Sequence, residues 1–332
     1  MIRIIPTLDY EIHGNGHGCA RELMVQPTER LMDMFNSYQA RITIMADVAE
    51  ILRFRDYHHE NGHDHYHAQA IETQLKKAIS EGHDVQLHLH SSYFNAHHVN
   101  NHWQQDWSEY DFARLDYSRM NWMIHSCKTY LEQLLQPVNP DYRCIAFRAA
   151  NWSMHPSEQA IRALLNNGIS IDTSVFKYGR RNHPVQFDYT HAHSHFMPWP
   201  VSTDDICCRD PNGKLIELPI YSEARSVWDF LSLNRMFRII QALPHRINIP
   251  KQASNPKVAP PSVWRDKMAW KADINQSTGK QLIGIAEKLT AYQNQHLDEL
   301  VPFVLIGHSK LFNAWNEHTI RPFLEHCLKN QH

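Results

Sequence analysis

The sequence predicts an α/β protein with a mostly parallel sheet covered by helices. Short apolar segments of the strand type alternate along the chain with segments whose apolar residues recur at helical spacing. Only 11 of the 332 residues are glycine, which argues against an all-β chain with many tight turns. Hydrophobic residues make up 42% of the chain, so it can bury a large core, and general disorder is excluded.

The expected elements follow one another in a βαβα order. Strands are expected at residues 3–8, 41–46, 84–90, 144–147, 169–171 and 302–306. Helices are expected at residues 29–38, 69–81, 117–135, 156–167 and 317–328. This alternation predicts one domain over residues 1–332, with strands inside and helices outside.

The middle of the chain interrupts this pattern. Extended segments are expected over residues 196–221, around a turn at Asp210-Pro211-Asn212-Gly213. A helical segment follows at 226–243, and residues 248–261, rich in proline, lysine and asparagine, are expected to form a surface loop. We therefore expect an irregular insertion at about residues 196–265.

Charge and targeting signals narrow the classes of function. The chain has 33 Lys and Arg against 35 Asp and Glu, a formal charge of −2, which gives no polybasic surface for nucleic acid. No apolar run approaches the ~18 residues of a membrane span, and the N-terminus does not read as a signal peptide. The six cysteines form no CxxC pair, so we expect free thiols and a cytoplasmic protein.

Histidine is unusually frequent, with 25 copies. Residues 58–67 form a polar, His-rich tract between a strand and a helix. The tract can be interpreted as a metal clip or as a solvated loop. Because it lacks hydrophobic neighbours that would fix the geometry of ligands, we expect the solvated loop.

Polar side chains recur where the expected strands end. In a closed parallel barrel these strand ends meet at one face, where the active sites of such barrels lie. The residues at the strand ends are Asp9, Glu11, His88, His90, Arg148, Asp172 and His308. Their convergence is a stronger indication of a site than any one of them.

Within this set, a metal site and an acid–base pair are both expected. His88 and His90 point to the same side of a strand, about 6.5 to 7 Å apart along it, and can share one ion with a carboxylate such as Glu11. The alternative is a pair of hydrogen-bonded barrel histidines without metal. Asp9 can act as a base, or as a turn residue, and Arg148 beside it can keep it ionised. His308 is a candidate general acid, with a solvated loop histidine as the alternative.

Five segments of the chain together resemble the polysaccharide deacetylases, which are carbohydrate esterase family 4 or the NodB-homology domain. Each motif alone is degenerate, but their order and spacing match from residue 7 to residue 311. The segments are Thr7-Leu8-Asp9-Tyr10-Glu11, Gly82-His83-Asp84-Val85-Gln86-Leu87-His88-Leu89-His90, Phe147-Arg148-Ala149-Ala150-Asn151-Trp152, Asp172-Thr173-Ser174 with Glu217-Leu218-Pro219, and Ile306-Gly307-His308-Ser309-Lys310-Leu311.

The resemblance implies a distorted (β/α)7 barrel and metal-dependent removal of an N-acetyl group from a sugar. By this resemblance Asp9 is the general base, Arg148 orients it with Asp172 as partner, and His308 protonates the leaving amine. The expected metal ligands are Glu11, His88 and His90. The expected substrate-binding residues are Trp152, Leu311 and Glu217.

Two departures from the family pattern bear on the metal. The usual adjacent pair of aspartates is split here by Tyr10, which separates Asp9 from Glu11. The usual second motif is HxxxH, but the fourth residue after His88 is Ser92. We expect His90 to supply the missing ligand, and the alternatives are a water in its place or a weakly bound metal.

The sequence therefore predicts a cytoplasmic, metal-dependent hydrolase that removes an N-acetyl or N-formyl group from a sugar in a surface-polysaccharide or lipopolysaccharide precursor. Zn²⁺ suits imidazole and carboxylate ligands, and Co²⁺, Mn²⁺ and Fe²⁺ are alternatives. Two other interpretations remain: a glycan-binding or scaffold barrel that has lost the metal, and a hydrolase of a non-sugar C–N bond. Trp103, Trp107, Trp152 and Trp199 can each supply a ring that stacks on a sugar or, equally, fill the core.

Overall fold

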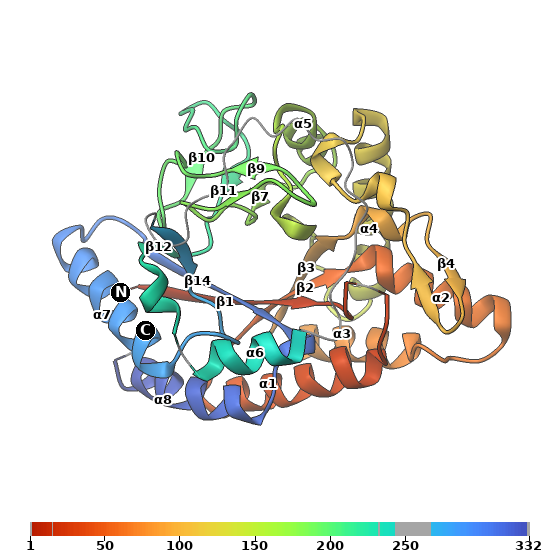
Figure 1. The fold of residues 1–332 in the computed structure, drawn as a ribbon, viewed down its shortest axis with the longest axis horizontal. Helices are drawn as coiled ribbons and strands as arrows, with labels where there is room; N and C mark the ends of the chain where they lie inside the picture. The colour runs from red at the N-terminus through yellow and green to blue at the C-terminus, as the bar shows by residue number, and fades with distance from the viewer. Residues whose placement is uncertain (1, 15, 232, 243–266, 331–332) are drawn as a thin grey trace.

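The computed structural model describes residues 2–14, 16–231, 233–242 and 267–330. Its centre is an eight-stranded sheet that curls around the middle of the molecule (Figure 1). In the described residues, seven neighbouring strands of this sheet run parallel. In spatial order they are β11 (Ile216–Glu217), β7 (Ile171–Asp172), β6 (Ala146–Ala149), β3 (Asp84–Leu89), β2 (Thr43–Asp47), β1 (Arg3–Tyr10) and β14 (Pro302–His308). The edge strand β10 (Trp199–Pro200) pairs with β11 in the antiparallel sense.

Helices connect the parallel strands and cover the outside of the sheet (Figure 1). They are α1 (Gln26–Ser37), α2 (Val48–Asn61), α3 (Ala68–Ser80), α4 (Tyr117–Leu135), α5 (Glu158–Asn166), α7 (Gly279–Gln295) and α8 (Ala314–Asn330). A further helix is α6 (Leu233–Ala242). Their ends follow local chemistry. The helix α2 stops at Gly62, whose φ of 71° suits a glycine, and α7 starts with a capping box between Thr278 and Gln281.

Three small antiparallel strand pairs accompany the main sheet, and the first two of them are hairpins. They are β4 (His97–Val99) with β5 (His102–Gln104), β8 (Arg180–Arg181) with β9 (Phe187–Asp188), and β12 (Ser222–Arg225) with β13 (Met268–Lys271). One of them, the β8–β9 hairpin, brings Arg181 to the pocket described below.

The register of the central strands gathers the polar strand ends. Asp9 of β1 lies opposite His308 of β14, and His88 of β3 lies opposite Arg148 of β6. Apolar residues of the same strands, such as Leu8, Leu87 and Phe147, are fully buried in the core. The polar residues therefore lie at the carboxyl ends of the parallel strands, while the helices cover the outside of the sheet.

The predicted fold class is confirmed, a curled parallel α/β sheet of the barrel type, and α4 has the predicted bounds. Three details differ. Both α2 and α7 were missed, and residues 58–61 of the His-rich tract belong to α2 and not to a loop. Within the expected irregular segment at 196–265, β11 pairs in parallel with β7 and so belongs to the main sheet. The loop expected at 248–261 lies outside the described residues.

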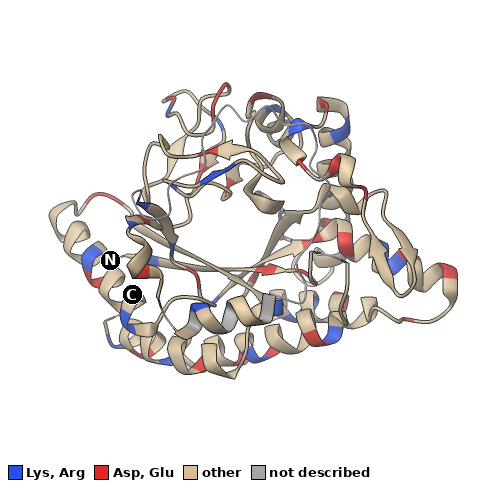
Figure 2. Cartoon of the chain, viewed as in Figure 1, with Lys and Arg blue, Asp and Glu red and all other residues tan. Residues whose placement is uncertain are grey.

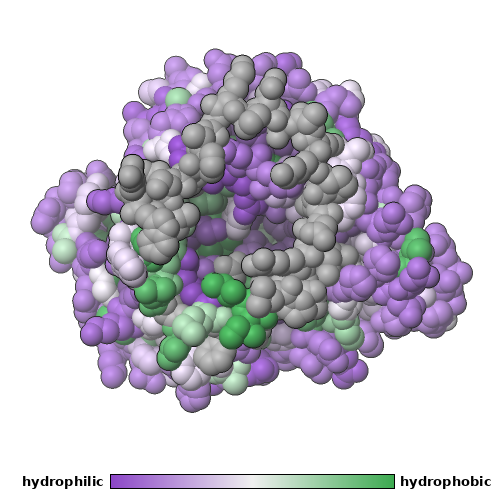
Figure 3. Space-filling model, in the orientation of Figure 1, coloured by the Kyte–Doolittle hydropathy of each residue, from purple (hydrophilic) through white to green (hydrophobic). Residues whose placement is uncertain are grey.

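The surface mixes both signs of charge. Basic and acidic residues are interspersed along the outer helices (Figure 2). Among the described residues, no helix is both long and apolar enough to cross a membrane. Apolar atoms gather over α6 beside the central hollow (Figure 3), where Leu233, Met236, Ile239 and Ile240 are exposed.

All six cysteines are free thiols.

Candidate active site

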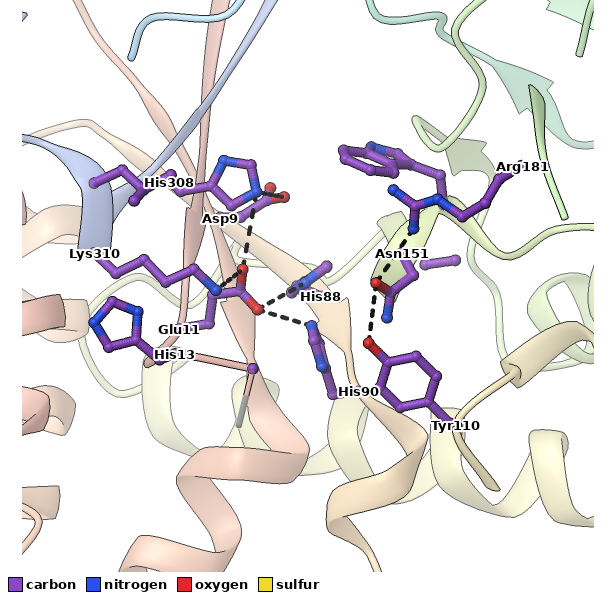
Figure 4. Close-up of a pocket in the computed structure, with 14 residues that line it drawn as sticks. Asp9, Glu11, His13, His88, His90, Tyr110, Asn151, Arg181, His308 and Lys310 are labelled. Atoms are coloured by element: carbon purple, nitrogen blue, oxygen red, sulfur yellow. Dashed lines mark hydrogen bonds and ion pairs between the residues drawn. The ribbon is translucent and has the colours of Figure 1, made fainter. Parts of the chain in front are cut away.

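A pocket of about 270 Å³ opens at the end of the sheet where the polar strand ends meet (Figure 4). Asp9, Glu11, His88, His90 and His308 all line it. The five side chains come from β1, β3 and β14 or from the residues directly after them. The structure therefore brings these five predicted residues together in one pocket.

Glu11 is the centre of a buried carboxylate–histidine cluster. Its Oε2 lies 2.7 Å from Nε2 of His90 and 3.7 Å from Nε2 of His88. Its Oε1 accepts a hydrogen bond of 2.8 Å from Nζ of Lys310. Burial raises the pKa of Glu11, but Lys310 and His90 together lower it by more than burial raises it, so the net pKa is well below its usual value.

A backbone contact fixes the tautomer of His88. Its Nδ1 lies 3.0 Å from the carbonyl oxygen of Arg148, which can only accept, so Nδ1 carries a proton and Nε2 is the nitrogen that has a free lone pair when the ring is neutral. Burial lowers the pKa of His88, but the carboxylates of Asp9 and Glu11 raise it, to about 9. Without a metal, the ring is therefore charged at neutral pH.

These three residues fit a divalent metal ion. Glu11, His88 and His90 are buried, and one ligand atom from each lies within 4.8 Å of the other two. A carboxylate and two imidazoles are a usual ligand set for Zn²⁺, and the carbonyl behind His88 is the outer partner that a histidine ligand needs. Ser92, where the family pattern has its second histidine, instead donates to Oε1 of Gln105 at 2.7 Å.

Asp9 lies beside this cluster with two basic side chains. Nη1 of the fully buried Arg148 donates to its Oδ1 at 2.6 Å, and Nε2 of His308 lies 3.6 Å from its Oδ2. Burial raises the pKa of Asp9, but Arg148 and the nearby histidines lower it more, so Asp9 is ionised at neutral pH. The geometry is that of an ionised base held by an arginine.

His308 differs from the expected protonated acid. Burial lowers its pKa to about 4, although Asp9 and Glu11 act in the opposite direction. The ring is therefore neutral at rest near pH 7. An acid role requires that it gain a proton during turnover, and Asp9 is the neighbouring group able to pass one.

Two predicted residues lie behind the pocket, not in it. Asp172 was expected to partner Arg148, but it accepts from Ser174, while Arg148 donates from Nε and Nη2 to Thr173. Glu217 was expected to contact substrate, but it is fully buried and accepts from the backbone N–H of Val175. The reason is the register, which sets Glu217 beside Asp172 on neighbouring strands.

Asp172 and Glu217 form a carboxyl pair that shares a proton. Burial raises the pKa of Glu217 well above its usual value, and Asp172 raises it further. Two carboxyl groups can bond to one another only when one of them is protonated. The pair therefore supports the sheet behind the site and does not contact a substrate in the pocket.

Trp152 and Leu311, two of the expected substrate-binding residues, line the pocket. The other three tryptophans that were candidates for stacking on a sugar do not line it. Trp103 and Trp199 are buried, and the indole of Trp199 donates to the carbonyl of Ile206. Sequence reasoning also missed several lining residues: His13, Gly14, Tyr110, Asn151, Arg181 and Lys310. Asn151 and Lys310 stand inside the quoted motifs, which was the one available signal for them.

Neither a family model nor a curated protein matches this chain. Solved structures match its fold. A predicted polysaccharide deacetylase from Mycobacterium smegmatis has a TM-score of 0.50 at 11% identity, over 98% of this chain and 84% of that protein. The PuuE allantoinase has a TM-score of 0.50 at 11% identity, over 100% and 85%.

A third match is larger than this chain. The 4-alpha-glucanotransferase from Thermococcus litoralis has a TM-score of 0.52 at 12% identity, over 100% of this chain but 38% of that protein. At these identities the likeness shows the fold and not the activity. The chain thus has the curled α/β barrel that a predicted polysaccharide deacetylase shares with an allantoinase.

Proposed function

We propose that this protein is a metal-dependent hydrolase that removes an N-acetyl or N-formyl group from a sugar. The observation that supports it best is the convergence of Glu11, His88 and His90 beside Asp9 and His308 in one pocket. A binding protein has no need for a buried, arginine-held carboxylate next to a histidine. The proposed substrate is a cytoplasmic precursor of a surface polysaccharide or lipopolysaccharide.

Glu11, His88 and His90 hold the proposed metal, with Zn²⁺ the ion that best suits their donor atoms. Such an ion supplies Lewis acidity to the acyl carbonyl. Lys310 holds one oxygen of Glu11 through a hydrogen bond, and this leaves the other oxygen directed at the two imidazoles.

The chain's own residues move the protons. Asp9, kept ionised by Arg148, takes a proton from the attacking water. His308, neutral at rest and 3.6 Å from Asp9, relays a proton to the amine nitrogen as the C–N bond breaks. Trp152 and Leu311 supply apolar surface for the sugar and the acyl methyl group.

The test combines metal content with acyl release. Wild-type protein should bind about one zinc, and His88→Ala should lose it, while the exposed His125→Ala serves as a matched control. With metal supplied, N-acetylated and N-formylated nucleotide sugars and lipid-linked glycans are assayed for acetate or formate. Asp9→Asn should lower the rate on the order of 10²- to 10⁴-fold.

Each result bears on one interpretation. Unchanged zinc in His88→Ala would remove the metal site. If the protein binds zinc and hydrolyses a cyclic amide but no acylated sugar, the non-sugar hydrolase is favoured. A protein that binds glycans, holds no metal and releases no acyl group would be the non-catalytic barrel.

A further inference from the structure

One wall of the pocket takes no part in the proposed metal binding or proton transfers, and only Trp152 of its residues has been given a role above, as apolar surface. It lies across from the carboxylate–histidine cluster and consists of Tyr110, Asn151, Trp152 and Arg181 (Figure 4). We call these four residues the Arg181 wall. Arg181 belongs to the β8–β9 hairpin, Asn151 and Trp152 follow β6, and Tyr110 lies in the segment before α4.

Among the described residues, Arg181 has no carboxylate partner for its positive charge. Its Nη1 lies 3.5 Å from Oδ1 of Asn151, and its Cζ stacks over the rings of Trp152 at 5.1 Å and Phe187 at 5.7 Å. Within the part of the chain that the structure describes, no carboxylate lies within ion-pair distance of it. Stacking on aromatic faces fixes the guanidinium plane and leaves its N–H edges for a planar anion.

The other charged residues at the pocket are already paired. Glu11 is held by Lys310, and Asp9 by Arg148. Neither carboxylate is therefore the partner of Arg181. Burial lowers the pKa of Arg181, as expected for a cation that is removed from water without a counter-ion. An arriving anion would offset that cost.

Asn151 adds a second free donor to this wall. Its Oδ1 accepts from Oη of Tyr110 at 3.2 Å, which orients the amide, and among the described residues its buried Nδ2 has no hydrogen-bond partner. Asn151 and Trp152 have φ values of 54° and 57°, a left-handed conformation that non-glycine residues rarely adopt. Strain of this kind is retained at sites where a side chain must be placed for binding.

We propose that the Arg181 wall is an anion subsite, and that the acylated sugar carries a carboxylate or phosphate group that Arg181 and Nδ2 of Asn151 bind. This inference rests on the proposed function for the sugar and names its chemical class. Arg181 is a specificity-determining residue, because it recognises a group remote from the scissile amide and favours anionic over neutral sugars.

The test measures binding, so it does not depend on turnover. The zinc-loaded protein is titrated calorimetrically with N-acetylglucosamine, with N-acetylglucosamine phosphate and with N-acetylglucosaminuronic acid. At least one anionic sugar should bind about tenfold or more tightly than the neutral sugar, the usual worth of a charge-assisted hydrogen bond. The phosphate and carboxylate arms show which anion the wall fits.

Three variants locate the effect. Arg181→Gln should lose the preference for the anionic sugar, and Arg181→Lys should keep part of it. The neighbouring Arg180→Gln, which does not line this pocket, should keep all of it. Thermal melts confirm that each variant is folded.

The inference is overturned if the wild-type protein binds neutral and anionic sugars equally, if it binds neither anionic sugar at millimolar concentration, or if Arg181→Gln keeps the preference. The proposed function fails differently. A retained anion preference with no acyl release from any sugar would leave the subsite and remove the hydrolase, whereas acyl release from neutral sugars at the anionic rate would do the reverse.

Discussion

Replacing Arg148 with glutamine removes a buried ion pair with Asp9, together with the hydrogen bonds of the guanidinium to Thr173. The Arg148 side chain is fully buried, with Nη1 2.6 Å from Oδ1 of Asp9, and Asp9 itself is 3% exposed. Arg148→Gln leaves the Asp9 carboxylate buried without its cation, a change that costs about 3–5 kcal/mol in other proteins. At about 2–4 °C per kcal/mol for somewhat shorter chains, Tm should fall on the order of 10 °C.

The pH dependence distinguishes this cause from a simple loss of packing. In the wild-type protein the pKa of Asp9 is lowered, so the pair stabilises the fold above the unfolded value near 3.9, and this is lost as pH falls. In Arg148→Gln burial is the largest remaining effect on Asp9, so we expect its pKa to rise. If it rises above the unfolded value, protonation stabilises the variant, so the gap to wild type should narrow as pH falls from 7 towards 5.

Urea unfolding of the metal-free proteins across this pH range measures the gap. The double variant Asp9→Asn with Arg148→Gln carries no uncompensated charge, so it should be more stable at pH 7 than Arg148→Gln alone. If the gap is constant with pH and the double variant is no more stable than the single one, the pair is not what holds these residues in place.

Two further predictions concern buried groups outside the pocket. Glu217 is protonated beside Asp172, so Glu217→Gln keeps the hydrogen bonds to Val175 and to Asp172 and should change the free energy of unfolding by less than about 1 kcal/mol. Glu217→Ala should cost several times more by urea unfolding. Equal losses in the two variants would show that the pair shares no proton. Burial and Arg41 lower the pKa of His83 to about 4, so stability should fall as pH drops from 6.5 towards 4, by on the order of 3 kcal/mol from this residue. His83→Gln should show a smaller loss over that range, and an unchanged pH profile would refute it.

The sequence predicted the central strands because each has an apolar run that ends in a polar residue. The same signal located Asp9, Glu11, His88 and His308, since the carboxyl ends of parallel strands must meet. It failed for Glu217, because a two-residue strand inside an irregular segment has no periodicity to detect, and its pairing with β7 depends on tertiary contacts. Register alone decides that its carboxyl group faces Asp172.

Arg181 could not be predicted for a related reason. It stands on a short hairpin at a place where no strand pattern or motif marks it, and it reaches the pocket only because β8 and β9 fold back over Trp152. His308 was located correctly, but its protonation state could not be read from the sequence. The depth of burial that lowers its pKa is a property of the folded pocket.

The single residue Arg148 serves both halves of the site through different atoms. Its carbonyl oxygen fixes the ring of His88, and its guanidinium holds Asp9. The carbonyl is present whatever side chain stands at this position, so a substitution can disable the base while the histidine keeps its orientation. In the proposed hydrolase, metal retention and catalytic competence are therefore separable, and a substitution of Arg148 is expected to leave the metal bound after the activity is lost.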